Sequence, residues 1–284
     1  MYLEFYGLKS RPFGKTPDPE MFFLSRRHEE ALARMEQAVE DRELLLLTGE
    51  IGSGKTTLSR ALIDRLPENF RPCLIINPRL SPNQLLRTVA RRLGALEPKY
   101  FKADLVEQTF DLLFQHYQNG ICPVLMIDET HLIPSRETFE EVRLLTNFQL
   151  DKENLMSVIL IGQPELNRRL QNPIYDALRQ RIGIKYHLGA LSPEEIPEYL
   201  DFRLKKAGRD KPLFAEEAIE LIRIYSGGIP RRINNLAANA LIEGFARDAK
   251  MINQRIIADV AKDLGMEEMV GVEEKKKNPV RKAG

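Results

Sequence analysis

The apolar run Leu44-Leu45-Leu46-Leu47-Thr48 leads into the octapeptide Gly49-Glu50-Ile51-Gly52-Ser53-Gly54-Lys55-Thr56, and the residues up to Ile63 have the character of a helix. An apolar strand, a glycine-rich loop that ends in Lys-Thr, and a helix are the context of a P-loop. The glycines let backbone N–H groups close around phosphate oxygens, and the helix adds its positive N-terminal end. The segment therefore predicts a nucleotide phosphate site formed by Gly49, Glu50, Ile51, Gly52, Ser53, Gly54, Lys55, Thr56 and Thr57.

A second segment, Pro123-Val124-Leu125-Met126-Ile127-Asp128-Glu129, is an apolar run that ends in two carboxylates. At a position C-terminal to a P-loop, this pattern is typical of a Walker B strand. Lys55 would then reach the β- and γ-phosphates, while Thr56 and Asp128 would hold Mg²⁺. Glu129 would orient and polarise the attacking water. The alternative is an Asp-Glu pair that only caps the next segment.

Composition agrees with a soluble nucleotide-binding protein. The 284 residues are 29% charged and 43% apolar, which excludes gross disorder. The 42 basic and 41 acidic residues nearly cancel, so any affinity for nucleic acid must come from local clustering. No stretch approaches the roughly 20 apolar residues of a membrane span, and the N-terminus lacks the pattern of a signal peptide. We therefore expect a cytoplasmic protein without an integral membrane segment.

The spacing of the cysteines and histidines matches no metal-binding motif. Cys73 and Cys122 each lie beside a predicted strand, and the four histidines are scattered. We expect both thiols to be reduced and buried in or near the core. No metal site is assigned to these residue types.

From the P-loop onward, strand and helix patterns alternate, as they do in a covered parallel sheet. A strand is expected at 74–77 and helices at 83–93 and about 104–117. Beyond Gly189, the sequence Ala190-Leu191-Ser192-Pro193 reads as a hinge, and helices are expected at about 193–207, 215–226, 230–247 and 253–264. The predicted domains are an α/β core at 1–189, a helical lid at 190–268 and a charged, disordered tail at 269–284.

Further segments carry polar and basic groups in a recognisable order. They are Gly162-Gln163-Pro164-Glu165-Leu166, Leu178-Arg179-Gln180-Arg181 and Gly228-Ile229-Pro230-Arg231, with Phe5-Tyr6-Gly7-Leu8, Arg11-Pro12-Phe13 and Pro17-Asp18-Pro19 near the N-terminus. Together with the P-loop and the Asp-Glu pair, these residues resemble the ExeA (general secretion pathway protein A) family of AAA+ ATPases over roughly residues 1–268. The resemblance implies a P-loop AAA+ core with a parallel sheet, followed by an α-helical lid.

The resemblance also implies roles for single residues. Gln163 corresponds to sensor I, which binds the γ-phosphate or positions the water, although it could be an amide in the turn before Pro164. Arg181 is the first choice for an arginine finger supplied to a neighbouring subunit, and Arg179 is the second. Arg231 corresponds to sensor II in the lid, with two ordinary surface arginines as the alternative. The stretch from Phe13 to Phe23 would flank the adenine, although Phe22 and Phe23 could equally be core residues.

Two departures from the family pattern bear on function. ExeA proper continues into a membrane span and a periplasmic part, whereas this chain ends in a short charged tail; short relatives are similar to ATPases that accompany transposases and assemble on DNA. The Walker B segment also reads Asp-Glu-Thr-His where Asp-Glu-Ala-Gln is more common, which puts only the turn after Glu129 in doubt.

Two uses of Mg·ATP therefore compete. The first is an ATPase that hydrolyses ATP at subunit interfaces of a ring or helical oligomer to assemble or remodel a partner, such as secretion or envelope components. The second is an ATP-switched scaffold on duplex DNA that works with a transposase. A predicted helix that carries Arg87, Arg91 and Arg92, followed by Lys99 and Lys102, is the candidate surface for DNA.

Overall fold

The computed structural model describes residues 1–14, 18–150 and 153–266. These residues form two compact units. One contains residues 26–51 and 55–189, and we call it the α/β unit; the other contains residues 1–25 and 52–54 and the chain from Ala190 onward, and we call it the helical unit. The predicted tail at 269–284, and the end of the predicted lid at 267–268, lie outside the described residues.

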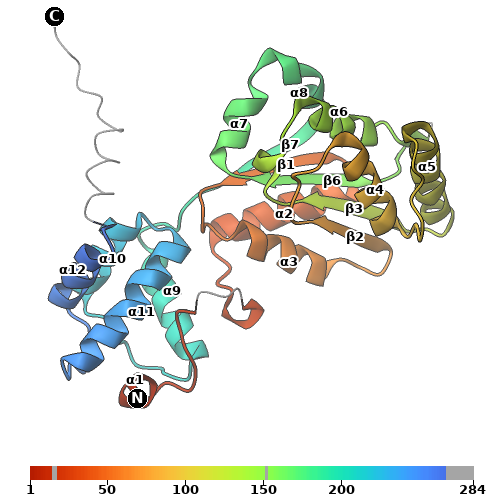
Figure 1. Cartoon of the computed structure of the whole chain (residues 1–284). Helices are drawn as coiled ribbons and strands as arrows, with labels where there is room; N and C mark the ends of the chain where they lie inside the picture. Colours follow the sequence, from red (N-terminus) through yellow and green to blue (C-terminus); the bar gives the residue numbers. More distant parts are fainter. Residues whose placement is uncertain (15–17, 151–152, 267–284) are drawn as a thin grey trace, which may run out of the picture. The chain divides into compact units, whose positions relative to one another are not determined.

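The α/β unit is built on a five-stranded sheet with the strand order β2-β3-β6-β1-β7 (Figure 1). Its strands are β1 Leu44–Gly49, β2 Phe70–Ile75, β3 Cys122–Ile127, β6 Ser157–Gly162 and β7 Ile182–Leu188. All neighbouring strands run parallel. The three middle strands are buried at every position, as expected when both faces of a parallel sheet are covered. The predicted α/β class with a parallel sheet is confirmed.

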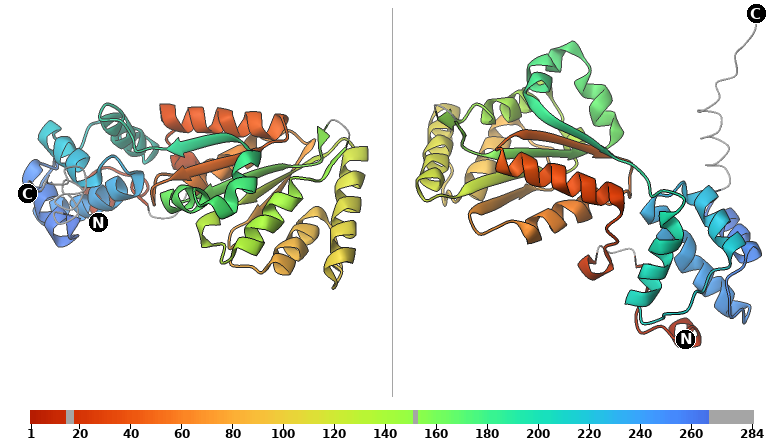
Figure 2. Two further views of the ribbon diagram at one scale, coloured as in Figure 1. Left: turned by 90° about the horizontal axis from the view of Figure 1, so that it is seen from above. Right: turned by 180° about the vertical axis from the view of Figure 1, so that it is seen from behind.

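Helices pack on both faces of this sheet (Figures 1 and 2). One face carries α2 Arg26–Glu40 and α3 Lys55–Arg65, and the other carries α4 Pro82–Leu93, α6 Arg136–Leu145, α7 Pro164–Leu170 and α8 Asp176–Arg181. Helix α5 Lys102–Gln118 packs against α4. Short elements complete the unit: η2 Thr130–Leu132, η3 Pro173–Tyr175, and the strand pair β4 Gln149–Leu150 and β5 Glu153–Asn154.

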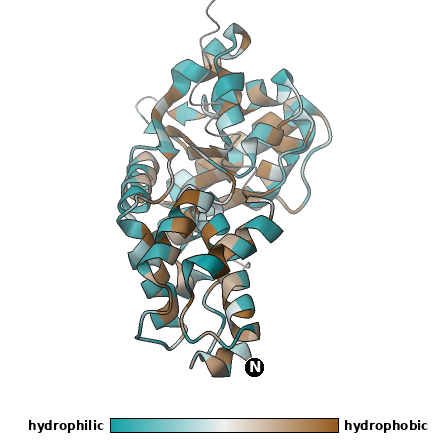
Figure 3. Cartoon of the chain, turned by 90° about the vertical axis from the view of Figure 1, so that its left-hand side faces the viewer, coloured by the Kyte–Doolittle hydropathy of each residue, from teal (hydrophilic) through white to brown (hydrophobic). Residues whose placement is uncertain are grey.

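Burial explains this arrangement. The middle strands β3, β6 and β1 are apolar and alternate their side chains between two covered faces, which places them in the interior (Figure 3). Helix α4 shows how the sequence sets the ends of a helix: Ser81 and Gln84 form a capping box, and Gly94 ends the helix at φ 116°.

Both thiols are buried as predicted, and burial raises the pKa of Cys73 to about 11.

The helical unit contains the elements expected in the C-terminal region. They are α9 Glu195–Lys206, α10 Glu216–Ser226, α11 Pro230–Ala246 and α12 Gln254–Asp263, with α1 Tyr2–Phe5 and η1 Pro19–Met21 from the N-terminus. Their buried apolar faces share one core. Within the described residues, no helix is both long and apolar enough to cross a membrane.

The N-terminal stretch departs from the predicted domain plan, because residues 1–25 belong to the helical unit and not to the α/β unit. Tyr6, Leu8 and Phe13 are buried in the helical core, and Arg203 donates hydrogen bonds to the carbonyls of Pro12 and Met21 at 2.6 and 2.8 Å. Burial of these apolar side chains in the helical core removes their surface from water, which stabilises this arrangement.

The aromatic residues predicted to flank the adenine pack in that core. The ring of Phe13 lies 5.9 Å from that of Phe214, and the ring of Phe23 lies 5.7 Å from that of Tyr199, both edge to face. For Phe23 this agrees with the core alternative. The part of the predicted stretch at 15–17 lies outside the described residues.

Candidate active site

Polar residues follow three neighbouring strands at the same edge of the sheet. The P-loop follows β1, the Asp-Glu pair follows β3, and Gln163 follows β6, which lies between them. The carboxyl ends of parallel strands are where α/β proteins place their ligands. The strand order therefore brings together groups that are more than a hundred residues apart in the sequence.

The P-loop connects β1 to α3. Gly52 and Gly54 have φ values of 84° and 102°, which side chains with a Cβ rarely adopt, so both positions require glycine. Lys55 begins α3, and its Nζ donates to the carbonyls of Gly49 and Glu50 at 2.7 and 2.9 Å. The ammonium thus lies over the loop that precedes it. Thr56 and Thr57 follow in the first turn of α3.

Thr56 and Asp128 are in direct contact. The Thr56 hydroxyl donates to Asp128 Oδ2 at 2.8 Å, and Asp128 Oδ1 accepts the backbone N–H of Glu129 at 2.8 Å. Asp128 is only 3% exposed. A hydroxyl and one carboxylate are the protein ligands with which P-loop sites hold Mg²⁺, the phosphates and water supplying the rest. The donor set fits that ion, and the described residues contain no larger cluster of His, Cys, Asp and Glu for a metal.

Glu129 has an unusual backbone conformation at the end of β3. Its φ of 53° and ψ of 35° lie in the left-handed region, which costs a residue with a Cβ about 1–3 kcal/mol. The Glu129 side chain is 39% exposed, and its Oε2 lies 3.3 Å from Nε2 of His131. The chain therefore turns sharply after Asp128, and the two carboxylates have different surroundings, one buried and one accessible.

His131 was not among the predicted site residues, yet it joins two of them. Its Nδ1 accepts the backbone N–H of Gln163 at 3.4 Å, while its Nε2 faces Glu129. Gln163 is half-buried at the N-cap of α7, and its side-chain amide makes no hydrogen bond to any described residue. The signal in the sequence is the histidine two positions after Glu129, where the chain departs from the family pattern.

The candidate finger residues lie on and at the end of α8, beside the edge strand β7. Arg179 is held twice within its own chain, by Asp176 at 2.7 Å and by the carbonyl of Gln171 at 3.3 Å. Arg181 is exposed, and its Nη2 donates to Asn147 Oδ1 at 2.7 Å. Arg181 is thus held by a neutral amide, whereas Arg179 is neutralised by a carboxylate.

Arg231 belongs to the helical unit. It is exposed in the first turn of α11, after Pro230, and its backbone N–H donates to the carbonyl of Gly52 at 3.3 Å. This unit includes the P-loop residues 52–54. The sensor II role of the Arg231 side chain stays a prediction.

Comparison with known proteins adds evidence for the family. Residues 37–170 match the model of an AAA domain family. General secretion pathway protein A of Aeromonas hydrophila is 39% identical over 258 residues, which are 89% of this chain and 46% of that protein. The chain thus spans less than half the length of this relative.

Several solved structures share the fold at low sequence identity. The Aeropyrum pernix ORC2 protein, solved as ADPNP–ADP complexes, has a TM-score of 0.64 at 16% identity, covering 90% of this chain and 71% of that one. Cdc6p from Pyrobaculum aerophilum has a TM-score of 0.66 at 16% identity, covering 89% and 70%. The Thermotoga maritima RuvB Holliday junction branch migration motor has a TM-score of 0.56 at 22% identity, covering 86% and 73%. The chain is therefore an AAA+ P-loop protein, related over most of its length to general secretion pathway protein A.

Proposed function

We propose that this chain binds Mg·ATP and hydrolyses it at the interfaces of a homo-oligomer, and that it couples hydrolysis to assembly or remodelling of a partner complex. The observation that carries the proposal is the contact of Thr56 with Asp128, with Glu129 directly beside it. A P-loop hydroxyl bonded to a buried Walker B carboxylate is a preformed pair of ligands for the metal. We place this activity in the cytoplasm, where ATP is available.

Each site residue has a separate task in the proposed reaction. Lys55 and the P-loop amides bind the β- and γ-phosphates, and Thr56 and Asp128 would hold Mg²⁺, which would neutralise phosphate charge. The oxygen of a water molecule bonds to the γ-phosphorus while the bond from that phosphorus to the bridging oxygen breaks. Glu129 accepts the proton of the water. Arg181 of a neighbouring subunit stabilises charge on the transferring group, and Gln163 and Arg231 contact the γ-phosphate.

Two variants separate binding from chemistry. Lys55→Ala should lose affinity for a fluorescent ATP analogue, because it removes a ground-state contact to phosphate. Glu129→Gln should retain that affinity and lose hydrolysis by roughly 10²–10⁴-fold, because an amide cannot accept the proton of water. Glu165→Gln, which changes an exposed glutamate on α7 that pairs with Arg168, is the matched control and should behave as wild type. Equal turnover by Glu129→Gln and wild type would contradict the proposed role.

A DNA-associated use is the second candidate, and the surface of α4 favours it. Arg87, Arg91 and Arg92 have no carboxylate partner among the described residues, whereas Lys102 is bound to the buried Glu141 at 2.6 Å. Other exposed arginines, such as Arg168 and Arg223, are paired with glutamates of their own helices. Two fold relatives, Drosophila ORC and the Aeropyrum pernix ORC1 protein, were solved with DNA, although at identities of 18% and 16% they show the fold alone.

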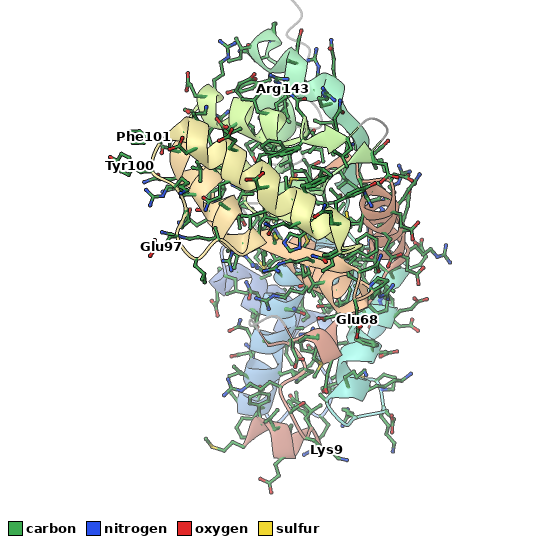
Figure 4. All side chains as sticks on the ribbon, turned by 90° about the vertical axis from the view of Figure 1, so that its right-hand side faces the viewer. Lys9, Glu68, Glu97, Tyr100, Phe101 and Arg143 are labelled. Carbon is green, nitrogen blue, oxygen red and sulfur yellow. The ribbon has the colours of Figure 1, made fainter. Side chains whose placement is uncertain are left out.

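Exposed aromatic side chains also occur in the segment that follows α4. Tyr100 and Phe101 are 74% and 69% exposed in the segment between α4 and α5, and they project from the unit (Figure 4). The arginines without a carboxylate partner are the groups that attract the phosphates of a duplex. We therefore propose that duplex DNA contacts α4 when the oligomer is loaded with ATP.

A salt titration of binding to fluorescent duplex DNA tests this candidate. With an ATP analogue present, Arg87→Ala/Arg91→Ala should weaken binding and reduce the log–log salt slope by roughly 0.9 for each phosphate that the variant no longer neutralises. Arg168→Ala/Arg223→Ala removes the same charge from two arginines that pair with glutamates, and it should leave the slope unchanged. Identical slopes for wild type and the α4 variant would exclude this surface, and no DNA binding at low salt would favour the secretion-assembly use.

A further inference from the structure

The turn after β3 contains a histidine with two specific partners, and neither is an ordinary surface contact. His131 lies in η2, and its side chain is only 12% exposed. Its two ring nitrogens point to different groups: Nδ1 to the backbone N–H of Gln163, and Nε2 to the carboxylate of Glu129. The ring therefore connects the ends of two neighbouring strands, β3 and β6.

The partners determine where the proton of the ring lies. A backbone N–H can only donate, so Nδ1 must present its lone pair to Gln163. With Nδ1 bare, the proton of the neutral ring lies on Nε2, the nitrogen that is 3.3 Å from Glu129 Oε2. The neutral ring with its proton on Nε2 satisfies both partners, whereas a doubly protonated ring would set two donors against each other at Nδ1. The tautomer follows from the contacts rather than from an observed hydrogen.

The turn that carries His131 is itself fixed. Arg169 of α7 donates to the carbonyl of Ile133 at 2.5 Å, and its guanidinium lies 4.7 Å from the centre of the Phe139 ring. The Thr130 hydroxyl donates to the carbonyl of Ile127 at 2.7 Å. These contacts hold η2 from both sides, so the imidazole is presented to Glu129 from a rigid support.

The place where His131 is anchored matters for the chemistry. In the sheet, β6 lies between β3 and β1, and β1 carries the P-loop. The imidazole that contacts Glu129 is therefore bonded to the end of the strand that lies between Glu129 and the P-loop. Without His131, an exposed carboxylate on a left-handed residue would rotate among several rotamers in solvent.

We infer that His131 is the positioning residue of Glu129: the imidazole, anchored through Nδ1 to the backbone N–H of Gln163, lies against the carboxylate and limits its rotation, so that the carboxylate is held ready to accept a proton from the attacking water. The inference rests on the proposed ATP hydrolysis. It makes His131 a second determinant of the rate, without any contact between His131 and the nucleotide.

Three substitutions of His131 separate this role from a structural one. His131→Ala removes both contacts, and it should lower hydrolysis at saturating ATP by roughly tenfold to a hundredfold, because the Glu129 carboxylate then loses the imidazole that lies against it. Affinity for an ATP analogue should change less than about twofold, because no phosphate contact is affected. His131→Asn can still accept the Gln163 N–H but is too short to reach Glu129, so it should be as slow as His131→Ala. His131→Gln offers an acceptor and a longer donor, so it should recover most of the rate.

The tautomer gives a measurement that does not depend on turnover. In protein labelled with ¹⁵N-histidine, the signal that disappears in His131→Ala should show the proton on Nε2 and a bare Nδ1 at mildly alkaline pH. A proton on Nδ1 would overturn the inference. So would equal hydrolysis rates for wild type, His131→Ala and His131→Asn in an active enzyme.

The wild-type rate separates this failure from failure of the proposed function. An inactive wild type that still binds the ATP analogue would contradict hydrolysis itself, and the inference would fall with it. An active wild type that the His131 variants match would contradict the inference alone.

Discussion

The α/β unit and the helical unit use their polar side chains in opposite ways. At the edge of the sheet, the Thr56 hydroxyl bonds to the Asp128 carboxylate, which also accepts the backbone N–H of Glu129, close to the ends of β1 and β3. In the helical unit, Arg203 and Tyr6 instead bond to backbone carbonyls far away in the sequence. We expect substitution of the residues at the sheet edge to change activity, and substitution of Arg203 or Tyr6 to change stability.

The largest effect is expected at Arg181, at the exposed end of α8. Arg181→Ala should bind ATP normally and lose hydrolysis by roughly 10³–10⁵-fold, the contribution of a finger in trans. Its melting temperature should not change, because the substitution removes a single exposed hydrogen bond, the one to Asn147. ATPase assays and thermal melts of the same preparations measure both quantities.

Mixing experiments separate a finger in trans from one in cis. Co-assembly of Arg181→Ala with Glu129→Gln should restore part of the activity, since some interfaces then join an intact finger to an intact Glu129. Asn147→Ala is the control: it frees Arg181 but leaves the guanidinium, so hydrolysis should stay within a few-fold of wild type. Absence of rescue in proven mixed oligomers would argue that Arg181 acts within its own subunit or has a purely structural role.

The α/β unit was the more predictable part because its signals are contiguous. The P-loop, the Asp-Glu pair and Gln163 each follow an apolar run, so the parallel sheet and the edge that unites them could be inferred from local pattern. The contact of His131 with Glu129 could not, because it depends on the left-handed turn at Glu129, which a non-glycine residue rarely adopts. The roles of these residues in catalysis remain predictions.

The helical unit shows where sequence reasoning fails. Its helices could be inferred from apolar periodicity, but the N-terminal residues 1–25 were assigned to the α/β core. The bonds from Arg203 to Pro12 and Met21 join positions 191 and 182 residues apart. No local pattern encodes such a pairing. Strand β7 was not predicted either. It lies at the edge of the sheet, where most of its positions are exposed or half-buried, so its sequence lacks the continuous apolar run of the middle strands.

Arg203 tests the stability side of the comparison, with the next largest effect. It is 7% exposed, and Arg203→Ala leaves two buried carbonyls without a donor, so the free energy of unfolding should fall by about 3 kcal/mol. Affinity of the remaining folded protein for the ATP analogue should be unchanged. Urea unfolding followed by circular dichroism measures the loss. Arg247→Ala removes an exposed arginine of the same unit, paired with Glu243 and Asp259, and should unfold at nearly the wild-type urea concentration.

The smallest effect is expected at Tyr6, which is 1% exposed and donates its hydroxyl to the carbonyl of Ala249 at 3.0 Å. Tyr6→Phe should cost about 1 kcal/mol at neutral pH, the net value of one neutral hydrogen bond. Burial raises the pKa of Tyr6 from 10.0 to about 12, against the smaller opposing influence of the Arg209 charge.

The folded pKa of Tyr6 lies above the unfolded one, so the folded state holds the proton more tightly. This contribution to stability is complete below about pH 10 and is lost as the pH rises toward 12. Wild type should therefore lose stability more steeply than Tyr6→Phe over this range, and the two urea midpoints should converge. Burial also raises the pKa of Tyr199, which is present in both proteins and cancels in the comparison. Parallel losses of stability by the two proteins would show that the Tyr6 hydroxyl is hydrated in the folded state. The N-terminal residues would then be held by the hydrogen bonds from Arg203 and Arg209 to backbone carbonyls and by apolar packing.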